Sequence, residues 1–115
     1  MDDKLKKALE FSNYMITFDN QKRILKEKYQ DDLIYYFNGG RFTATQELVS
    51  FCQSLVNLEQ TSTILVDDNN LPIAIEDLKE FSFEIVNVYF TATNQYLTEY
   101  NKLKTNRSVE GIFDV

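Results

Sequence analysis

Apolar residues recur at helical spacing through the first part of the chain. They step by 3, 4, 3, 7 and 4 residues at Ala8, Phe11, Met15, Phe18, Leu25 and Tyr29. This spacing is close to the heptad pattern of helices that pack in pairs. We therefore expect a continuous or kinked helix over residues 1–30, although the stretch "NYMITFDN" lowers helix propensity in its middle. The stripe would either pack on the domain core or join copies of the chain, and its candidate seam residues are Phe11, Met15, Phe18 and Leu25.

A hairpin is predicted next, in the segment "DLIYYFNGGRFTAT", residues 32–45. Side chains alternate between the two faces of a strand. One face of the first strand carries Leu33, Tyr35 and Phe37, and the other carries Ile34 and Tyr36. Asn-Gly and Gly-Gly pairs accept positive φ, so Asn38, Gly39 and Gly40 predict a tight structural turn that fixes strand register.

A short helix and a second hairpin follow. Thr43 followed by Gln46 fits a capping box, which predicts an amphipathic helix over roughly residues 45–58. Two apolar runs, residues 63–66 and 71–75, then flank the polar stretch "DDNN". Calcium loops alternate their oxygen ligands and end in a distant Glu, and neither that Glu nor the required Gly is in place here. A polar hairpin turn is therefore favoured. Pro72 lacks a ladder donor, which puts its strand at an edge or its first residues outside the ladder.

The longest apolar pattern lies near the end of the chain. One stripe steps by 3, 4, 3, 4 and 4 through Leu78, Phe81, Ile85, Val88, Ala92 and Tyr96, and a second lies beside it at Phe83, Val86, Phe90 and Leu97. So broad an apolar arc predicts a helix over about residues 76–104 that is buried over much of its girth. Either the domain's own sheet and helices cover it, or a partner does. In a chain this small, the aromatic excess favours self-association into a homo-oligomer.

These elements predict an α+β fold, a small antiparallel sheet of two hairpins packed by a long C-terminal helix, a short middle helix and an N-terminal helix. The expected organisation is an N-terminal helix over 1–30 that could oligomerise, an α+β domain over 31–104 and a C-terminal tail over 105–115.

The tail "NRSVEGIFDV" departs from the preceding helical periodicity. A chain end of this kind frays or folds back on the core. Alternatively it docks on a partner protein, because "SVEGIFDV" resembles the C-terminal sliding-clamp-binding peptides of phage replication and late-transcription proteins, without their usual second aromatic residue. The candidate docking residues are Val109, Ile112, Phe113 and Val115.

Composition and charge narrow the classes of partner. At 115 residues, 43% hydrophobic and 26% charged, the chain is expected to form one small globular domain. Residues 1–28 carry seven Lys/Arg and five Asp/Glu, a balance of +2, and the remainder carries five and thirteen, a balance of −8. Nucleic-acid binding needs a concentrated positive face, and the basic stripe around Lys22-Arg23 is interrupted by Glu27, so a solvated helix face is favoured.

No apolar run approaches the ~18 residues of a membrane span, and there is no apolar signal region.

Candidate chemistry is sparse. The chain has no His, hence no imidazole base and no common transition-metal ligand. Cys52 falls within an apolar helical pattern, which predicts a buried free thiol in a reducing compartment. The paired acids, such as Asp31-Asp32 and Glu76-Asp77, lie at predicted element boundaries, where carboxylates cap helices and turns. We therefore expect no catalytic, cofactor-binding or metal-ligating residues, no cofactor and no enzymatic activity.

The order of elements resembles a domain of unknown function found in tailed-bacteriophage proteins, often at the C-terminal end of tail, fibre or fibre-assembly proteins. The resemblance covers about residues 22–104. Three segments carry it: "FNGGRFTATQELVSF", "STILVDDNNLPIAIEDLKEF" and "FEIVNVYFTATNQYLTEYNKLK". They are similar to the family's strand–Asn-Gly–strand segment running into a helix, its second strand pair and its closing helix. The family commonly carries a Trp in the strand before the second turn, where this chain has Ile64-Leu65.

The resemblance implies a phage origin and a tail-associated structural or assembly role, exerted by protein–protein contact in the virion or the host cytoplasm. It brings no active site to transfer. The alternative is a small acidic phage regulatory protein that binds a host or phage enzyme, through its acidic segment or its C-terminal tail.

Overall fold

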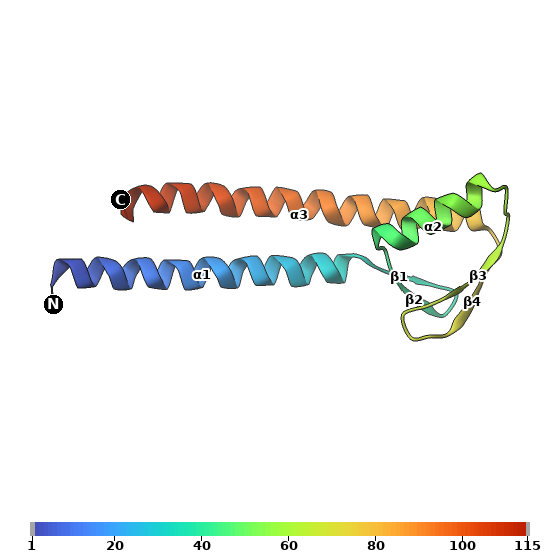
Figure 1. Ribbon diagram of the computed structural model, residues 1–115, viewed down its shortest axis with the longest axis horizontal. Helices are drawn as coiled ribbons and strands as arrows, with labels where there is room; N and C mark the ends of the chain where they lie inside the picture. The colour runs from blue at the N-terminus through green and yellow to red at the C-terminus, as the bar shows by residue number, and fades with distance from the viewer. Residues whose placement is uncertain (1, 115) are drawn as a thin grey trace. The chain divides into compact units, whose positions relative to one another are not determined.

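The computed structural model describes residues 2–114, with side chains described for residues 2–105. The described residues form three helices and two hairpins, which confirms the predicted α+β class (Figure 1). In chain order the elements are α1 (Asp3–Asp32), β1 (Ile34–Phe37), β2 (Gly40–Thr43), α2 (Gln46–Asn57), β3 (Thr63–Val66), β4 (Pro72–Ile75) and α3 (Leu78–Asp114). The predicted single sheet is wrong, because the hairpins form two separate two-stranded antiparallel sheets, β1-β2 and β3-β4.

The chain divides into two compact units, and the division differs from the predicted boundaries. The helical unit comprises Met1–Tyr29 with Gln95–Val115, and the hairpin unit comprises Gln30–Asn94. The distal part of α3 therefore groups with α1 and not with the α+β unit. The backbone also stays helical to Asp114, well beyond the predicted end near residue 104. Loss of apolar periodicity marks the loss of a buried face, and it ends a helix only when a stop signal accompanies it.

In the helical unit, α1 lies antiparallel to the distal part of α3 (Figure 1). The rings of Tyr29 and Tyr96 stack with their centroids 4.5 Å apart. Phe18 and Leu103 are buried in the same unit. Of the predicted seam residues, Phe18 is thus buried within its own chain, Met15 and Leu25 are half-buried, and Phe11 remains 49% exposed. Helix α1 is continuous through "NYMITFDN", because tertiary packing overrides a weak local propensity.

The first hairpin has the predicted tight turn, with one change of role. Phe37 pairs with Gly40, so the loop contains only Asn38 and Gly39. Both have positive φ, 50° and 80°, as a type I′ turn requires. Gly40 belongs to β2 and not to the turn. A Cβ at Gly40 would lie 2.7 Å from Cγ1 of Ile73, so this glycine permits close packing between the hairpins.

Phe81, near the start of α3, is the centre of the hairpin unit's core. Its ring lies 5.9 Å from Tyr35, 5.4 Å from Phe37 and 5.2 Å from Phe42, centroid to centroid. The strand face predicted to carry Tyr35 and Phe37 is therefore the inner face, and Tyr36 on the opposite face is exposed. Other side chains with almost no exposure complete this core: Ile75, Leu78, Ile85 and Cys52.

Helix α2 lies close to its predicted range, but the predicted capping box is wrong. Thr45 is the N-cap, and its Oγ1 accepts the Leu48 N–H at 3.1 Å. Thr43 cannot serve as the cap because it is still paired in β2 with Ile34. Gln46, the predicted reciprocal partner of Thr43, instead donates from Nε2 to the hydroxyl of Tyr89 at 2.8 Å.

Candidate protein-interaction face

A buried carboxylate joins the two hairpins. Asp67 Oδ1 accepts the backbone N–H groups of Asn69 and Leu71, at 3.0 and 2.8 Å. Its Oδ2 accepts the Arg41 N–H from strand β2, at 3.0 Å. The bond from Arg41, followed by that from Leu71, lowers the pKa of Asp67, because hydrogen bonds to the charged form favour it. The predicted polar hairpin turn is confirmed, and Asp67 adds a tertiary contact to it.

Three more hydrogen bonds strengthen this junction. The Asp68 N–H donates to the Arg41 carbonyl at 2.8 Å, and the Thr43 hydroxyl donates to the Asp68 carboxylate at 2.6 Å. Asn38, in the first turn, donates from Nδ2 to the Ala74 carbonyl of β4 at 3.2 Å. We call these five residues the hairpin clasp: Asn38, Arg41, Thr43, Asp67 and Asp68. The clasp thus ties the turn of each hairpin to a strand of the other.

The opposite face of that hairpin is apolar and exposed. Side chains alternate along the two strands, so that Leu65, Ile73 and Ile75 are buried. The outer β3–β4 face consists of Ile64, Val66, Pro72 and Ala74, and all four are exposed. Ile64 is 69% and Val66 65% exposed. An apolar outer face on a two-stranded sheet is unusual, because such faces normally carry polar residues.

Strand β3 also presents an unpaired backbone edge. The Asp67 N–H donates to the Leu71 carbonyl at the turn. Hydrogen-bonded and non-hydrogen-bonded pairs alternate along an antiparallel ladder, so Val66 and Ile64 fall in non-hydrogen-bonded pairs and direct their N–H and C=O groups away from β4. No backbone hydrogen bond from another described segment reaches these two residues.

Natural edge strands are usually guarded by Lys, Pro or a bulge. β4 carries Pro72, and its Ala74 carbonyl is occupied by Asn38. β3, with the sequence "TILV", has neither a charge nor a proline. An edge of this kind has the chemistry to pair with another strand.

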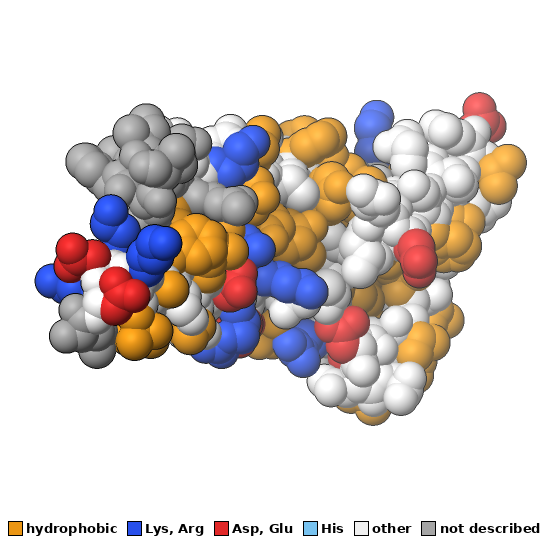
Figure 2. All heavy atoms as spheres, turned by 60° about the vertical axis from the view of Figure 1, so that its left-hand side comes forward, with side chains coloured by type: hydrophobic (Ala, Val, Ile, Leu, Met, Phe, Trp, Pro, Cys, Tyr) orange, Lys and Arg blue, Asp and Glu red, His pale blue; other side chains and the backbone are white. Residues whose placement is uncertain are grey.

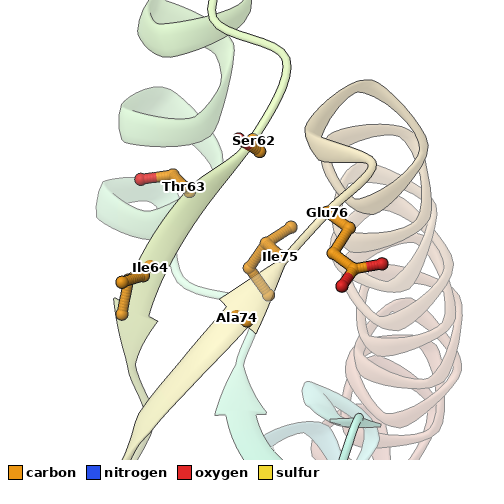
Figure 3. Close-up of a pocket in the computed structure, with 6 residues that line it drawn as sticks. All are labelled: Ser62, Thr63, Ile64, Ala74, Ile75 and Glu76. Atoms are coloured by element: carbon orange, nitrogen blue, oxygen red, sulfur yellow. The ribbon is translucent and has the colours of Figure 1, made fainter.

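An open depression of about 580 Å³ lies at the end of this hairpin away from its turn (Figure 3). Six residues line it: Ser62, Thr63, Ile64, Ala74, Ile75 and Glu76. In Figure 3, Ser62, Thr63 and Ile64 lie on the β3 side, and Ala74, Ile75 and Glu76 lie on the β4 side. Ile64 belongs both to this depression and to the outer face, so the two features form one surface.

Helix α3 carries a second exposed apolar feature. Phe83 is 64% and Phe90 55% exposed, so the chain's own packing leaves the second predicted stripe largely uncovered. Figure 2 shows hydrophobic side chains at the surface in several separate places on the face drawn there.

The structure places the residues predicted from sequence in different settings. Asn38 belongs to the hairpin clasp, Gly39 to the turn and Gly40 to the hairpin–hairpin contact. The proposed docking residues Val109, Ile112, Phe113 and Val115 lie outside the residues whose side chains the structure describes. Sequence reasoning missed the role of Asp67. The available signal was an Asp that opens a turn rich in Asn and Asp, where its carboxylate can accept backbone N–H groups.

Among the residues with described side chains, no group of three or more His, Cys, Asp or Glu is placed to hold a metal ion. Cys52 is buried as predicted, and desolvation raises the pKa of its thiol. In the described part of the chain, no helix has both the length and the apolar character needed to cross a membrane. The chain matches no protein-family model, no curated protein and no solved structure.

Proposed function

We propose that this chain is a tail-associated structural or assembly protein of a tailed bacteriophage, which acts by protein–protein contact and without catalysis. The observation that carries the proposal is the unguarded β3 edge, flanked by the exposed side chains of Ile64 and Val66. The resemblance of residues 22–104 to a domain of phage tail and fibre-assembly proteins supplies the phage setting. The protein would act in the virion, or in the host cytoplasm while the tail is assembled.

The geometry suits a partner that contributes an extended apolar segment. Such a segment can add to β3 as a further strand, where main-chain hydrogen bonds supply affinity and alternate side-chain contacts supply specificity. The outward N–H and C=O groups of Ile64 and Val66 provide the main-chain partners. The outer β3–β4 face and the depression beside it provide apolar contact.

The role in the particle is tested with purified phage. Mass spectrometry of virions should detect the chain, or deletion of its gene should give particles with missing or defective tails. Absence from virions together with normal tails after deletion would overturn the proposal. That outcome would favour the acidic regulatory protein instead.

The β3 edge is tested by Val66→Pro. This change removes an outward N–H but no ladder hydrogen bond, because Val66 lies in a non-hydrogen-bonded pair. We expect an unchanged circular dichroism spectrum and at least a tenfold loss of incorporation into virions or of tail assembly. Val66→Thr is the matched control, since it keeps the N–H and a β-branched side chain, and it should behave nearly as wild type. Normal function of the Val66→Pro variant would show that β3 is not the contact.

A further inference from the structure

The exposed face of α3 in the hairpin unit has a seven-residue repeat. Phe83 and Phe90 are seven residues apart, and Asn87 and Asn94 follow each of them at the same distance of four residues. The sequence continues the repeat with Leu97 and Asn101. We define the outer stripe of α3 as the members in the hairpin unit: Phe83, Val86, Asn87, Phe90 and Asn94. All are exposed except Val86, which is half-buried.

Beyond Phe83, which is followed directly by Glu84, the helix around this stripe carries no charge over an unusually long interval. From Ile85 to Thr98, "IVNVYFTATNQYLT", there is no Asp, Glu, Lys or Arg, although 26% of the whole chain is charged. A helix face left to solvent normally carries charged residues. The centres of protein–protein interfaces, by contrast, are depleted of charge and enriched in aromatic side chains. The composition of the outer stripe is that of an interface centre.

We propose that the outer stripe of α3 binds the same stripe of a second copy of this chain. A repeat of seven residues keeps one face of a helix turned toward a parallel or antiparallel partner helix. Binding to a flat surface of another protein does not require such a repeat. In a two-fold contact the same patch is used by both copies and must be complementary to itself.

The chemistry of the stripe meets this requirement of self-complementarity. An Asn side chain both donates and accepts hydrogen bonds, so Asn87 can pair with an amide of an identical row. The two phenylalanines supply the apolar contact. Each copy has a net charge of −6. Two copies repel each other least when the surface through which they meet carries no charge, and residues 85–98 of α3 carry none.

The size of the stripe indicates the strength of the contact. An aromatic side chain covers roughly 150–250 Å², and Phe83 and Phe90 are each more than half exposed. The two rings thus offer on the order of 200 Å² per copy, a fraction of the roughly 800 Å² per partner of a standard stable interface. We therefore expect a weak, reversible dimer and not a permanent one.

The test is sedimentation equilibrium of the purified full-length chain from about 1 to 300 µM. Wild type should pass from monomer to dimer across this range. Phe90→Asp should raise the Kd at least tenfold, and Phe83→Asp combined with Phe90→Asp should give a monomer throughout. Phe51→Asp, on a half-exposed Phe of α2 in the same unit, is the matched control and should leave the Kd within threefold of wild type. Circular dichroism spectra and melting curves show whether each variant is folded.

Asn87→Asp tests the contribution of electrostatic repulsion to dimer stability, because the substitution adds a negative charge with almost no change of side-chain shape. We expect this variant to have a several-fold higher Kd than wild type at 0.1 M salt. At 1 M salt the Kd should return toward the wild-type value, because the Debye length falls from about 10 Å to about 3 Å. A wild-type chain that is monomeric at 300 µM would overturn the proposal. A dimer that resists the double Phe substitution, or that Phe51→Asp disrupts equally, would also overturn it. Because these measurements use the isolated protein, their outcome is independent of whether the chain is found in virions.

Discussion

Gly40 is required for close packing between the two hairpins, and its neighbours in the sequence do not indicate this role. Its place in Asn-Gly-Gly predicts a turn residue, yet it lies in β2 against Ile73. We expect Gly40→Ala to lower the free energy of unfolding by about 1–3 kcal/mol, because the added Cβ would also lie 3.0 Å from Phe42 Cε2 and both neighbours are buried. Urea unfolding followed by circular dichroism measures this cost.

Gly39→Ala is the matched comparison for that substitution. A Cβ at Gly39 meets nothing within 4 Å, so its cost comes from the φ of 80° alone, about 1 kcal/mol. Adding Ile73→Val should recover part of the Gly40→Ala loss and none of the Gly39→Ala loss. Equal recovery in both, or a neutral Gly40→Ala, would contradict the close approach of the hairpins.

Between elements, the hairpin clasp makes stability depend on pH. The pKa of Asp67 is lower in the folded chain than the value of about 3.9 expected when the chain is unfolded. The carboxylate therefore contributes its full stabilisation above pH ~4, and this contribution is lost as the pH falls through the lowered folded-state pKa. We expect the melting temperature to fall on acidification below pH ~4.

Asp67→Asn tests this dependence. The amide nitrogen cannot accept, so the variant should melt several degrees lower than wild type at pH 7, and the difference should shrink as the pH falls below ~4. Asp68→Asn removes the same charge from the same turn. Its carboxylate is exposed and accepts one hydrogen bond among the described side chains, from the Thr43 hydroxyl, so its effect should be smaller. If the difference in melting temperature between wild type and Asp67→Asn stayed constant down to pH 2.5, Asp67 would be excluded as the titrating group.

The elements themselves could be predicted largely from periodicity and turn residues. Alternation and the Asn-Gly pair place the first hairpin, and the spacing from Leu78 to Tyr96 places the start of α3. The cap of α2 could not be predicted as easily, because Thr43 and Thr45 both offer a hydroxyl. Only the pairing of Thr43 with Ile34 decides between them. The role of Asp67 needs Arg41, a residue 26 positions away, and such tertiary partners leave no local trace in the sequence.

At the scale of the whole molecule, the sequence leaves open which surface covers each apolar stripe. The α1 stripe fits equally a domain core, another copy or a second helix of the same chain, because all three bury a heptad seam. The structure pairs it with the distal part of α3, and the Tyr29–Tyr96 stack marks this pairing. The large apolar side chains Ile64 and Val66 of the outer β3–β4 face, and Phe83 and Phe90 of the outer stripe of α3, are exposed, which is why the proposed contacts with other proteins fall there.

This pairing predicts how the chain responds to loss of α1. After deletion of residues 2–29, the distal part of α3 lacks its partner, and a solitary helical segment of this length is marginal in water. Hydrogen exchange should therefore lose protection over residues 95–105, while residues 34–75 of the hairpin unit keep theirs. Tyr29→Ala in the full chain, which removes only the ring stack, should produce a smaller loss confined to the helical unit. Loss of protection across the hairpin unit as well would show that its core depends on α1, contrary to the two compact units.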